Sequence, residues 1–147
     1  MREMKAYLVV SNETKNLATV REFVLNTLKE AGAPASCARQ VVLAVDEAVS
    51  NIIRHAYKEF SSGTRTIDIT LLTRGRCVEV ILRDSGKEFD PATYHDPDIK
   101  EHVRQRRKYG LGLFLIRKVM DEVKYVFKSG VENELRMVKY ISAEEES

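Results

Sequence analysis

Three side chains that could do chemistry recur at every fourth position of one helix-length run. Glu47, Asn51 and His55 lie within residues 41–57, and at about 3.6 residues per turn this spacing stacks them along one ridge of a helix. A carboxylate ionised at neutral pH can act as a general base, and an amide oxygen can bind a hard cation such as Mg²⁺. The run predicts a helix with one chemically active face, although a solvated face with His55 as a local cap would have the same spacing.

The opposite face of the same run is apolar. Pro34 and Ser36 suit a helix start, and residues 61–63 suit a break, so we expect the helix to run from about 34–36 to Lys58. At about 100° per residue, the arc facing away from the ridge is filled by Val41, Val42, Val45, Ala48, Val49, Ile52, Ile53 and Ala56. This arc predicts that the helix packs on a hydrophobic core.

A second candidate group, Asp84-Ser85-Gly86, directly follows a strand pattern. The Asp84 carboxylate could accept a hydrogen bond from an exocyclic amine such as that of adenine, and Gly86 would let the backbone approach a flat ring. A plain turn after a strand has the same sequence, so this signal is weak alone.

The third candidate group is Gly110-Leu111-Gly112, which leads into a helical pattern. Glycines at a helix start let backbone amides converge on an anion, although they also serve as a packing device. Arg104 and Lys108 lie just upstream and could neutralise a polyphosphate or solvate a loop. The dinucleotide-binding fingerprint is excluded because a third glycine and a directly preceding strand are missing. Together, the three groups meet the separate needs of one ligand, Mg-ATP.

The elements that must position these groups follow from periodicity. Residues 84–108 show no regular period and predict a lid over about 86–110. Helices are expected from a cap at Asn12 or Thr14 through Leu28, over the run described above, and from Tyr109 through Met120; strands are expected over 5–11, 66–72, 77–82, 123–128 and 135–141. We therefore predict one α+β domain over 1–147, with a mostly antiparallel, mixed sheet and helices on one face.

Composition narrows the class of protein. The 147 residues are 44% hydrophobic and 31% charged, as in a globular domain, and the net charge of +2 argues against direct nucleic-acid binding. No apolar run reaches the length of a membrane span, and no signal-peptide pattern opens the chain. Cys37 and Cys77 are far apart, which favours reduced thiols and a cytoplasmic protein. The acidic end, 143–147, is expected to fray.

Several motifs resemble those of the GHKL, or Bergerat-fold, ATP-binding superfamily. Residues 47–51 with 55–57 are similar to its N box, 84–86 to its first glycine box and 110–113 to its second, in the expected order. The match extends from about Asn12 to Ile141 and is closest in style to bacterial anti-sigma factor serine/threonine-protein kinases. Glu88 stands where many relatives carry a second glycine, which favours this subfamily over the histidine kinases.

The resemblance implies a two-layer α/β sandwich, ATP and Mg²⁺ as ligands, and a role for each motif residue. It implies Glu47 as the catalytic base, Asn51 as the metal ligand, Asp84 and Gly86 as the adenine site, and 110–112 with the upstream cations as the phosphate side. The implied activity is phosphorylation of an anti-sigma antagonist protein together with binding of a sigma factor. A partner-switch regulator acting on a scaffold or a phosphatase, or binding without phosphoryl transfer, is the alternative. A homodimer is also expected, with the N-terminal strand and the first helix, including Phe23 and Leu28, as interface elements.

Overall fold

The computed structural model describes residues 1–59, 65–84, 111–128 and 132–143, leaving aside the side chains of 55–59, 111–113 and 127–128. In chain order the elements are β1 (Met4–Ser11), the 3-10 turn η1 (Thr14–Asn16), α1 (Leu17–Ala31), α2 (Ala35–Glu59), β2 (Thr66–Arg74), β3 (Cys77–Asp84), α4 (Leu111–Val119), β4 (Glu122–Lys128) and β5 (Glu132–Tyr140). No helix of the described residues is long and apolar enough to span a membrane.

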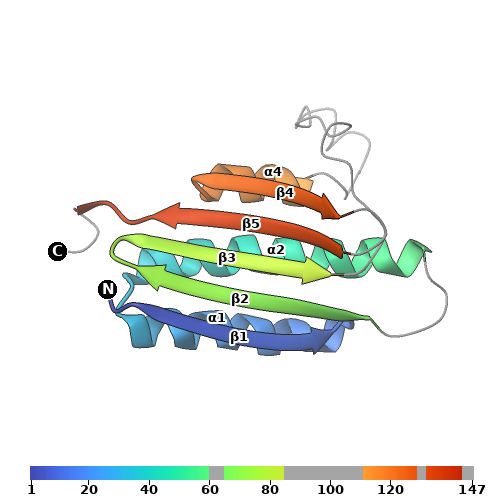
Figure 1. Cartoon of the computed structure of the whole chain (residues 1–147), viewed down its shortest axis with the longest axis horizontal. Coiled ribbons are helices and arrows are strands. Elements are labelled where there is room, and N and C mark those ends of the chain that lie inside the picture. Colours follow the sequence, from blue (N-terminus) through green and yellow to red (C-terminus); the bar gives the residue numbers. More distant parts are fainter. Residues whose placement is uncertain (60–64, 85–110, 129–131, 144–147) are drawn as a thin grey trace.

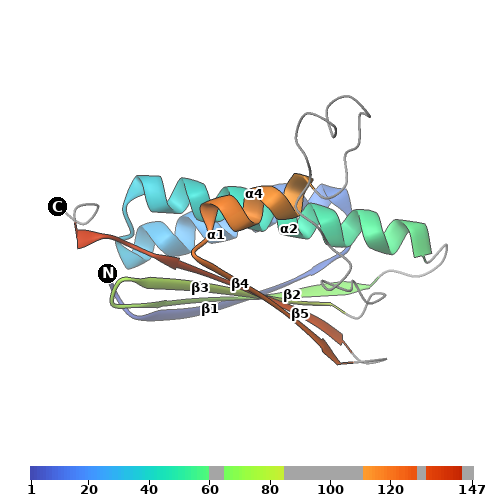
Figure 2. The ribbon, with the colours of Figure 1, turned by 90° about the horizontal axis from the view of Figure 1, so that it is seen from above.

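The strands form one sheet in the order β1-β2-β3-β5-β4. Each of its four neighbouring pairs is antiparallel, so the sheet is not mixed within the described strands. The hairpin between β2 and β3 turns at Gly75, whose φ of 59° lies in the left-handed region that glycine tolerates. Among the described elements, the helices α1, α2 and α4 lie on one face of the sheet (Figures 1 and 2). The predicted two-layer α+β architecture is confirmed.

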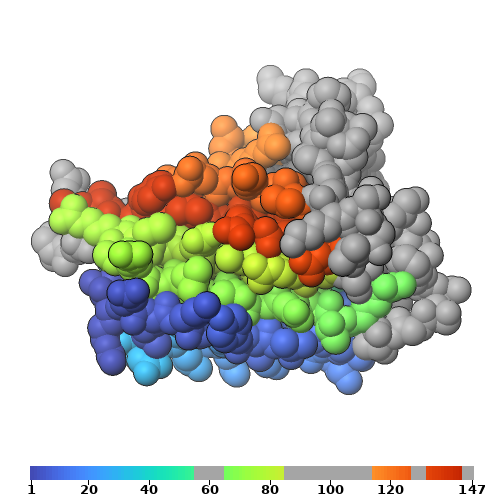
Figure 3. All heavy atoms as spheres, viewed as in Figure 1, coloured from blue at the N-terminus to red at the C-terminus, as the bar shows by residue number. Residues whose placement is uncertain are grey.

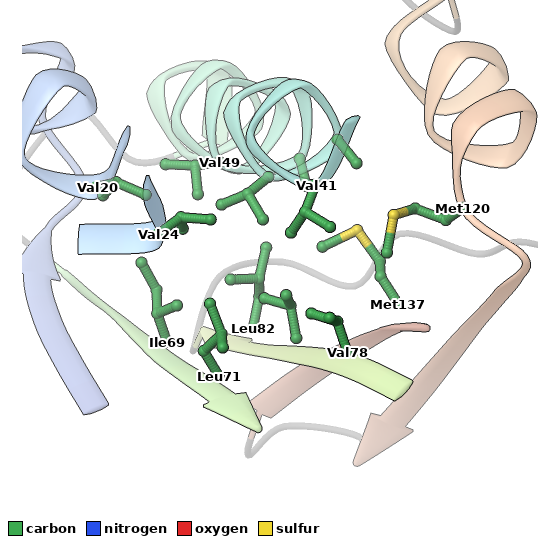
Figure 4. Packing of buried hydrophobic residues seen from close by; sticks show 14 of the residues in the cluster. Val20, Val24, Val41, Val49, Ile69, Leu71, Val78, Leu82, Met120 and Met137 are labelled. Atoms are coloured by element: carbon green, nitrogen blue, oxygen red, sulfur yellow. The ribbon is translucent and has the colours of Figure 1, made fainter. Parts of the chain in front are cut away.

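The core lies between the helix layer and the sheet (Figure 4). Alternate residues of each strand point toward the helices because successive strand side chains point to opposite faces. The buried set includes Val20 and Val24 from α1, Val41 and Val49 from α2, Ile69, Leu71, Val78, Leu82 and Met137 from the sheet, and Met120 after α4. Burial of the apolar arc of α2 fixes how this helix is rotated, and so fixes the direction of its polar ridge.

The start of the first helix differs from the prediction. We expected a cap at Asn12 or Thr14, but α1 begins only at Leu17, after the η1 turn. The Asn12 side-chain oxygen instead accepts a hydrogen bond from the backbone N–H of Arg65, at 3.1 Å. A contact between segments 53 positions apart therefore takes the side chain that local sequence had suggested for capping.

The other face of the sheet is the one that Figure 3 views, and no helix of the described residues covers it. On this face Glu134 accepts hydrogen bonds from Arg83 Nε at 2.8 Å and from Arg136 Nε at 2.9 Å. Glu134 is only 6% exposed. The hydrogen bond from Arg136, followed by the positive charges of both guanidinium groups, holds the pKa of the Glu134 carboxyl below its usual range. The charged network therefore satisfies a carboxylate that this sheet face nearly buries.

The burial of α1 corrects the expected dimer interface. Leu28 is fully buried in the core, so its predicted role at a dimer interface is wrong, whereas Phe23 is partly buried against the same core. Helix α1 presents Leu28 to the sheet because its apolar stripe also includes Val20 and Val24. Neither Cys37 nor Cys77 forms a disulfide bond, as expected.

Candidate functional site

The polar ridge of α2 is built as the spacing predicts. Val45, Ala48 and Val49 are buried, whereas Glu47 and Asn51 are both half-buried on the same helix. Among the described residues, no hydrogen bond or ion pair engages the Glu47 carboxylate. Its neighbour Asp46 is instead held 2.9 Å from Arg21 Nε of α1. Of the two adjacent carboxylates, Asp46 ties the helices together and Glu47 remains available for chemistry.

Asn51 is already in contact with a cationic group. Its Oδ1 accepts a hydrogen bond from Arg54 Nη2, at 2.5 Å, across three positions of α2. The oxygen therefore lies where a positive charge is tolerated, which fits a hard metal ion. The described residues contain no cluster of three His, Cys, Asp or Glu side chains that could hold a metal. A metal at Asn51 would take few protein ligands, and Mg²⁺ bound mainly to phosphate and water fits such a site.

Asp84 is the last residue of β3 and shares the helix-facing side of the sheet with Leu82. Directly opposite it on β5 is Asn133, which is 5% exposed and donates a hydrogen bond from Nδ2 to Asp84 Oδ1 at 3.4 Å. Burial, and then the negative charge of Asp84, raise the pKa of Tyr125 on β4. Three strands thus bring a carboxylate, an amide and a phenol together at one end of the sheet.

Asn133 and Tyr125 were not predicted as site residues. The apolar pattern predicts a last strand that begins at residue 135, whereas β5 begins at Glu132 and pairs Asn133 with Asp84. A buried asparagine followed by alternating apolar residues is a usable signal, because a buried amide needs a polar partner. Its partner, 49 positions away, becomes evident only from the strand register.

The predicted phosphate-side residues are only partly within the described chain. Leu111 and Gly112 form the first turn of α4, so Gly112 lies inside the helix rather than before it. Gly86, Arg104, Lys108 and Gly110 lie outside the described residues, as does the expected lid over 86–110. The side chain of His55 and residues 144–147 of the expected tail are also outside them.

The described site elements meet at one end of the sandwich. α4 packs against α2, and its first turn lies at the same end of the molecule as the end of β3 and the C-terminal half of α2 (Figures 1 and 2). The C-terminal half of α2, the end of β3 and the start of α4 therefore lie at one end of the molecule, although they come from three separate parts of the chain. Elements that meet in this way can contribute side chains to one extended ligand.

Comparison with known proteins agrees with this arrangement. Residues 10–139 match the histidine kinase-like ATPase domain. The chain belongs to this ATPase domain family. Within curated proteins, it is 33% identical over 133 residues to the serine-protein kinase RsbW of Staphylococcus aureus strains MSSA476 and Newman, an alignment that covers 88% of this chain and 82% of each relative. Membership of the ATPase family and relationship to RsbW confirm the resemblance drawn from the three motif groups.

Two solved structures share the fold of this ATPase domain. The SiaB–SiaC complex from Pseudomonas aeruginosa contains a chain with a TM-score of 0.64 and 20% identity, covering 93% of this chain and 89% of that one. The RsbU and RsbW domains of Rv1364c from Mycobacterium tuberculosis give a TM-score of 0.63 at 18% identity. That match covers 93% of this chain but only 32% of the Rv1364c chain. Both similarities support the two-layer fold of the ATPase family.

Proposed function

We propose that this protein is an ATP-dependent protein-serine kinase that also acts as an anti-sigma factor. The main support is the pair Glu47 and Asn51, set one helical turn apart on α2 in a chain related to the serine-protein kinase RsbW over most of its length. The carboxylate has no competing partner among the described residues, whereas its neighbour Asp46 is paired with Arg21.

Each site residue has a proposed task in ATP binding. Asp84 accepts a hydrogen bond from the adenine amine, with Asn133 orienting its carboxylate, and Gly86 lets the backbone lie close to the ring. Asn51 holds Mg²⁺, which when bound would neutralise charge on the phosphate groups. Gly110, Leu111 and Gly112 give backbone N–H groups to the phosphates, and Arg104 and Lys108 add positive charge there.

Glu47 carries the proton transfer in this proposal. A serine hydroxyl oxygen of the substrate protein attacks the γ-phosphorus, its proton passes to a Glu47 carboxylate oxygen, and the bond from the γ-phosphorus to the bridging oxygen breaks, so that ADP leaves. The product is a phosphoserine, and the proton on Glu47 is then lost to water. Phosphoryl transfer depends mainly on positioning and charge neutralisation, so a single carboxylate on a helix is sufficient for the proton transfer.

The proposed partners are an antagonist protein, which is the phosphorylation substrate, and a sigma factor. The third proposed partner is another copy of this chain, which would form a homodimer. β1 pairs only with β2 among the described strands, and its Tyr7 and Val9 side chains are 62% and 61% exposed. An open strand edge with exposed apolar side chains supports self-association through β1. This surface keeps the N-terminal strand of the expected interface and leaves out Leu28, which is buried in the core.

The test uses the purified full chain with candidate antagonists and sigma factors from the same genome. Calorimetry with Mg-ATP or Mg-ADP present measures binding of each candidate, and mass spectrometry after incubation with Mg-ATP locates any new phosphate. We expect one small partner to gain phosphate on a serine and one sigma factor to bind without modification. Binding to a scaffold or phosphatase, with no phosphoserine formed, would instead support the partner-switch alternative and reject the kinase.

A further inference from the structure

The hydrogen bond between Arg54 and Asn51 has a consequence for metal binding. Arg54 Nη2 lies 2.5 Å from Asn51 Oδ1, and both side chains are half-buried on the same side of α2. A guanidinium group stays protonated at any physiological pH, so this oxygen is in contact with a permanent positive charge. Asn51 is also the residue whose oxygen is proposed to bind Mg²⁺.

Two cations cannot both use this oxygen without strong repulsion. Like charges a few ångströms apart repel, and partial burial lowers the screening that water would provide. The three-residue spacing places Arg54 on the turn next to Asn51, so separating the two groups requires rotation of the Arg54 side chain and no change in the helix backbone. The contact is thus strong enough to compete and local enough to be reversible.

We propose that Arg54 is a positioning residue that competes with Mg²⁺ for the Asn51 oxygen, so that the site accepts its metal only after the guanidinium has moved away. The inference rests on the proposed nucleotide site. Arg54 therefore lowers the affinity of the chain for Mg-ADP, compared with a site in which the Asn51 oxygen contacts no guanidinium group. Arg54 also keeps the Asn51 amide oriented before the nucleotide enters.

The test replaces Arg54 by methionine, which keeps the stem length and helix propensity but removes the charge and the donors. Calorimetry then measures ADP binding with Mg²⁺ present and with the metal removed by a chelator. Arg54→Met should bind Mg-ADP about tenfold more tightly, which corresponds to about 1.4 kcal/mol, while metal-free ADP binding stays unchanged. In an Asn51→Ala background the same substitution should have no effect on Mg-ADP binding.

Two further variants keep the test decisive. Arg39→Met removes an equally charged but exposed side chain from the same helix, roughly 22 Å from Arg54, and should leave both affinities unchanged. Arg54→Lys keeps the charge but loses the planar guanidinium group, so its gain in Mg-ADP affinity should be smaller than that of Arg54→Met. This variant replaces Arg54→Met in the test if the methionine variant does not fold.

Three outcomes would overturn the inference. Unchanged or weaker Mg-ADP binding by Arg54→Met would show that Arg54 does not compete. Weaker binding of ADP both with and without metal would make Arg54 a phosphate contact. If the wild-type chain binds no ADP, the proposed function is rejected as well. If ADP binding depends on the metal and is abolished by Asn51→Ala but unchanged by Arg54→Met, only this inference is rejected.

Discussion

Replacing Asp84 by asparagine should change which nucleobase the site accepts. In the structure, Asp84 Oδ1 accepts the Nδ2 hydrogen of Asn133, and in the proposed site the Asp84 carboxylate also accepts a hydrogen bond from the adenine amine. An asparagine at position 84 has one oxygen only. That oxygen should accept the hydrogen bond from the Asn133 amide N–H₂, and the new amide N–H₂ of residue 84 then faces the ligand.

The size of the effect follows from the lost interaction. A hydrogen bond to a charged group contributes about 1.5–3 kcal/mol, so Asp84→Asn should bind Mg-ADP about 10- to 150-fold more weakly. The new amide can instead donate to a carbonyl oxygen at the same ring position, as in inosine diphosphate. The ratio of the ADP to the inosine diphosphate affinity should therefore fall by more than the ADP affinity alone.

Calorimetric titration of both nucleotides measures this ratio directly. Asp68→Asn is the matched control, because Asp68 is exposed on β2 and its side chain points to the sheet face without helices. Alkaline titration of tyrosine absorbance adds a structural check: losing the Asp84 charge should lower the pKa of Tyr125. If the ratio of the two affinities is the same in Asp84→Asn and wild type, Asp84 does not read the base.

Three other predictions concern stability and assembly. Leu28→Ala removes a fully buried side chain and should lower the free energy of unfolding by about 2–5 kcal/mol in urea titrations; an effect below 1 kcal/mol would contradict the packing of α1. Because the pKa of Glu134 is lowered in the folded state, its ionised form stabilises the protein above the unfolded pKa and that stability is lost as pH falls through the folded value. Glu134→Gln should therefore be less stable than wild type at neutral pH, and the difference should shrink in acid; a constant difference across that range would argue against the ion-pair network. Val9→Lys should weaken self-association by roughly tenfold in light-scattering dilution series, whereas an unchanged dimer would exclude the β1 edge as the interface.

Much of the candidate site could be predicted because its geometry is local. The Glu47–Asn51 spacing follows from the helical repeat alone, and the apolar arc of α2 fixes which way the pair faces. Asp84 could be singled out because it ends a strand whose period was clear. These features depend on residues within about two turns or one strand, so their sequence pattern contains the needed information.

The parts that could not be predicted depend on contacts between distant segments. Asn133 lies beside Asp84 only because β5 pairs with β3 in one register. The start of α1 shifted because Asn12 bonds to Arg65 across the β1–β2 edge of the sheet. The Arg54–Asn51 contact is local, yet no sequence pattern selects one rotamer of a long side chain over another.

The assignment of this chain as a protein-serine kinase depends on the transfer of phosphate to a serine of its partner. Wild-type protein and Glu47→Gln are each incubated with γ-labelled Mg-ATP and the antagonist that binds them, while Mg-ADP affinity is measured in parallel. We expect the wild type to phosphorylate the serine and Glu47→Gln to do so at a rate about 10²- to 10⁴-fold lower. The two proteins should bind Mg-ADP with nearly equal affinity. Equal transfer rates for the two proteins would contradict the assignment of Glu47 as the base, and no transfer by either would contradict the kinase itself.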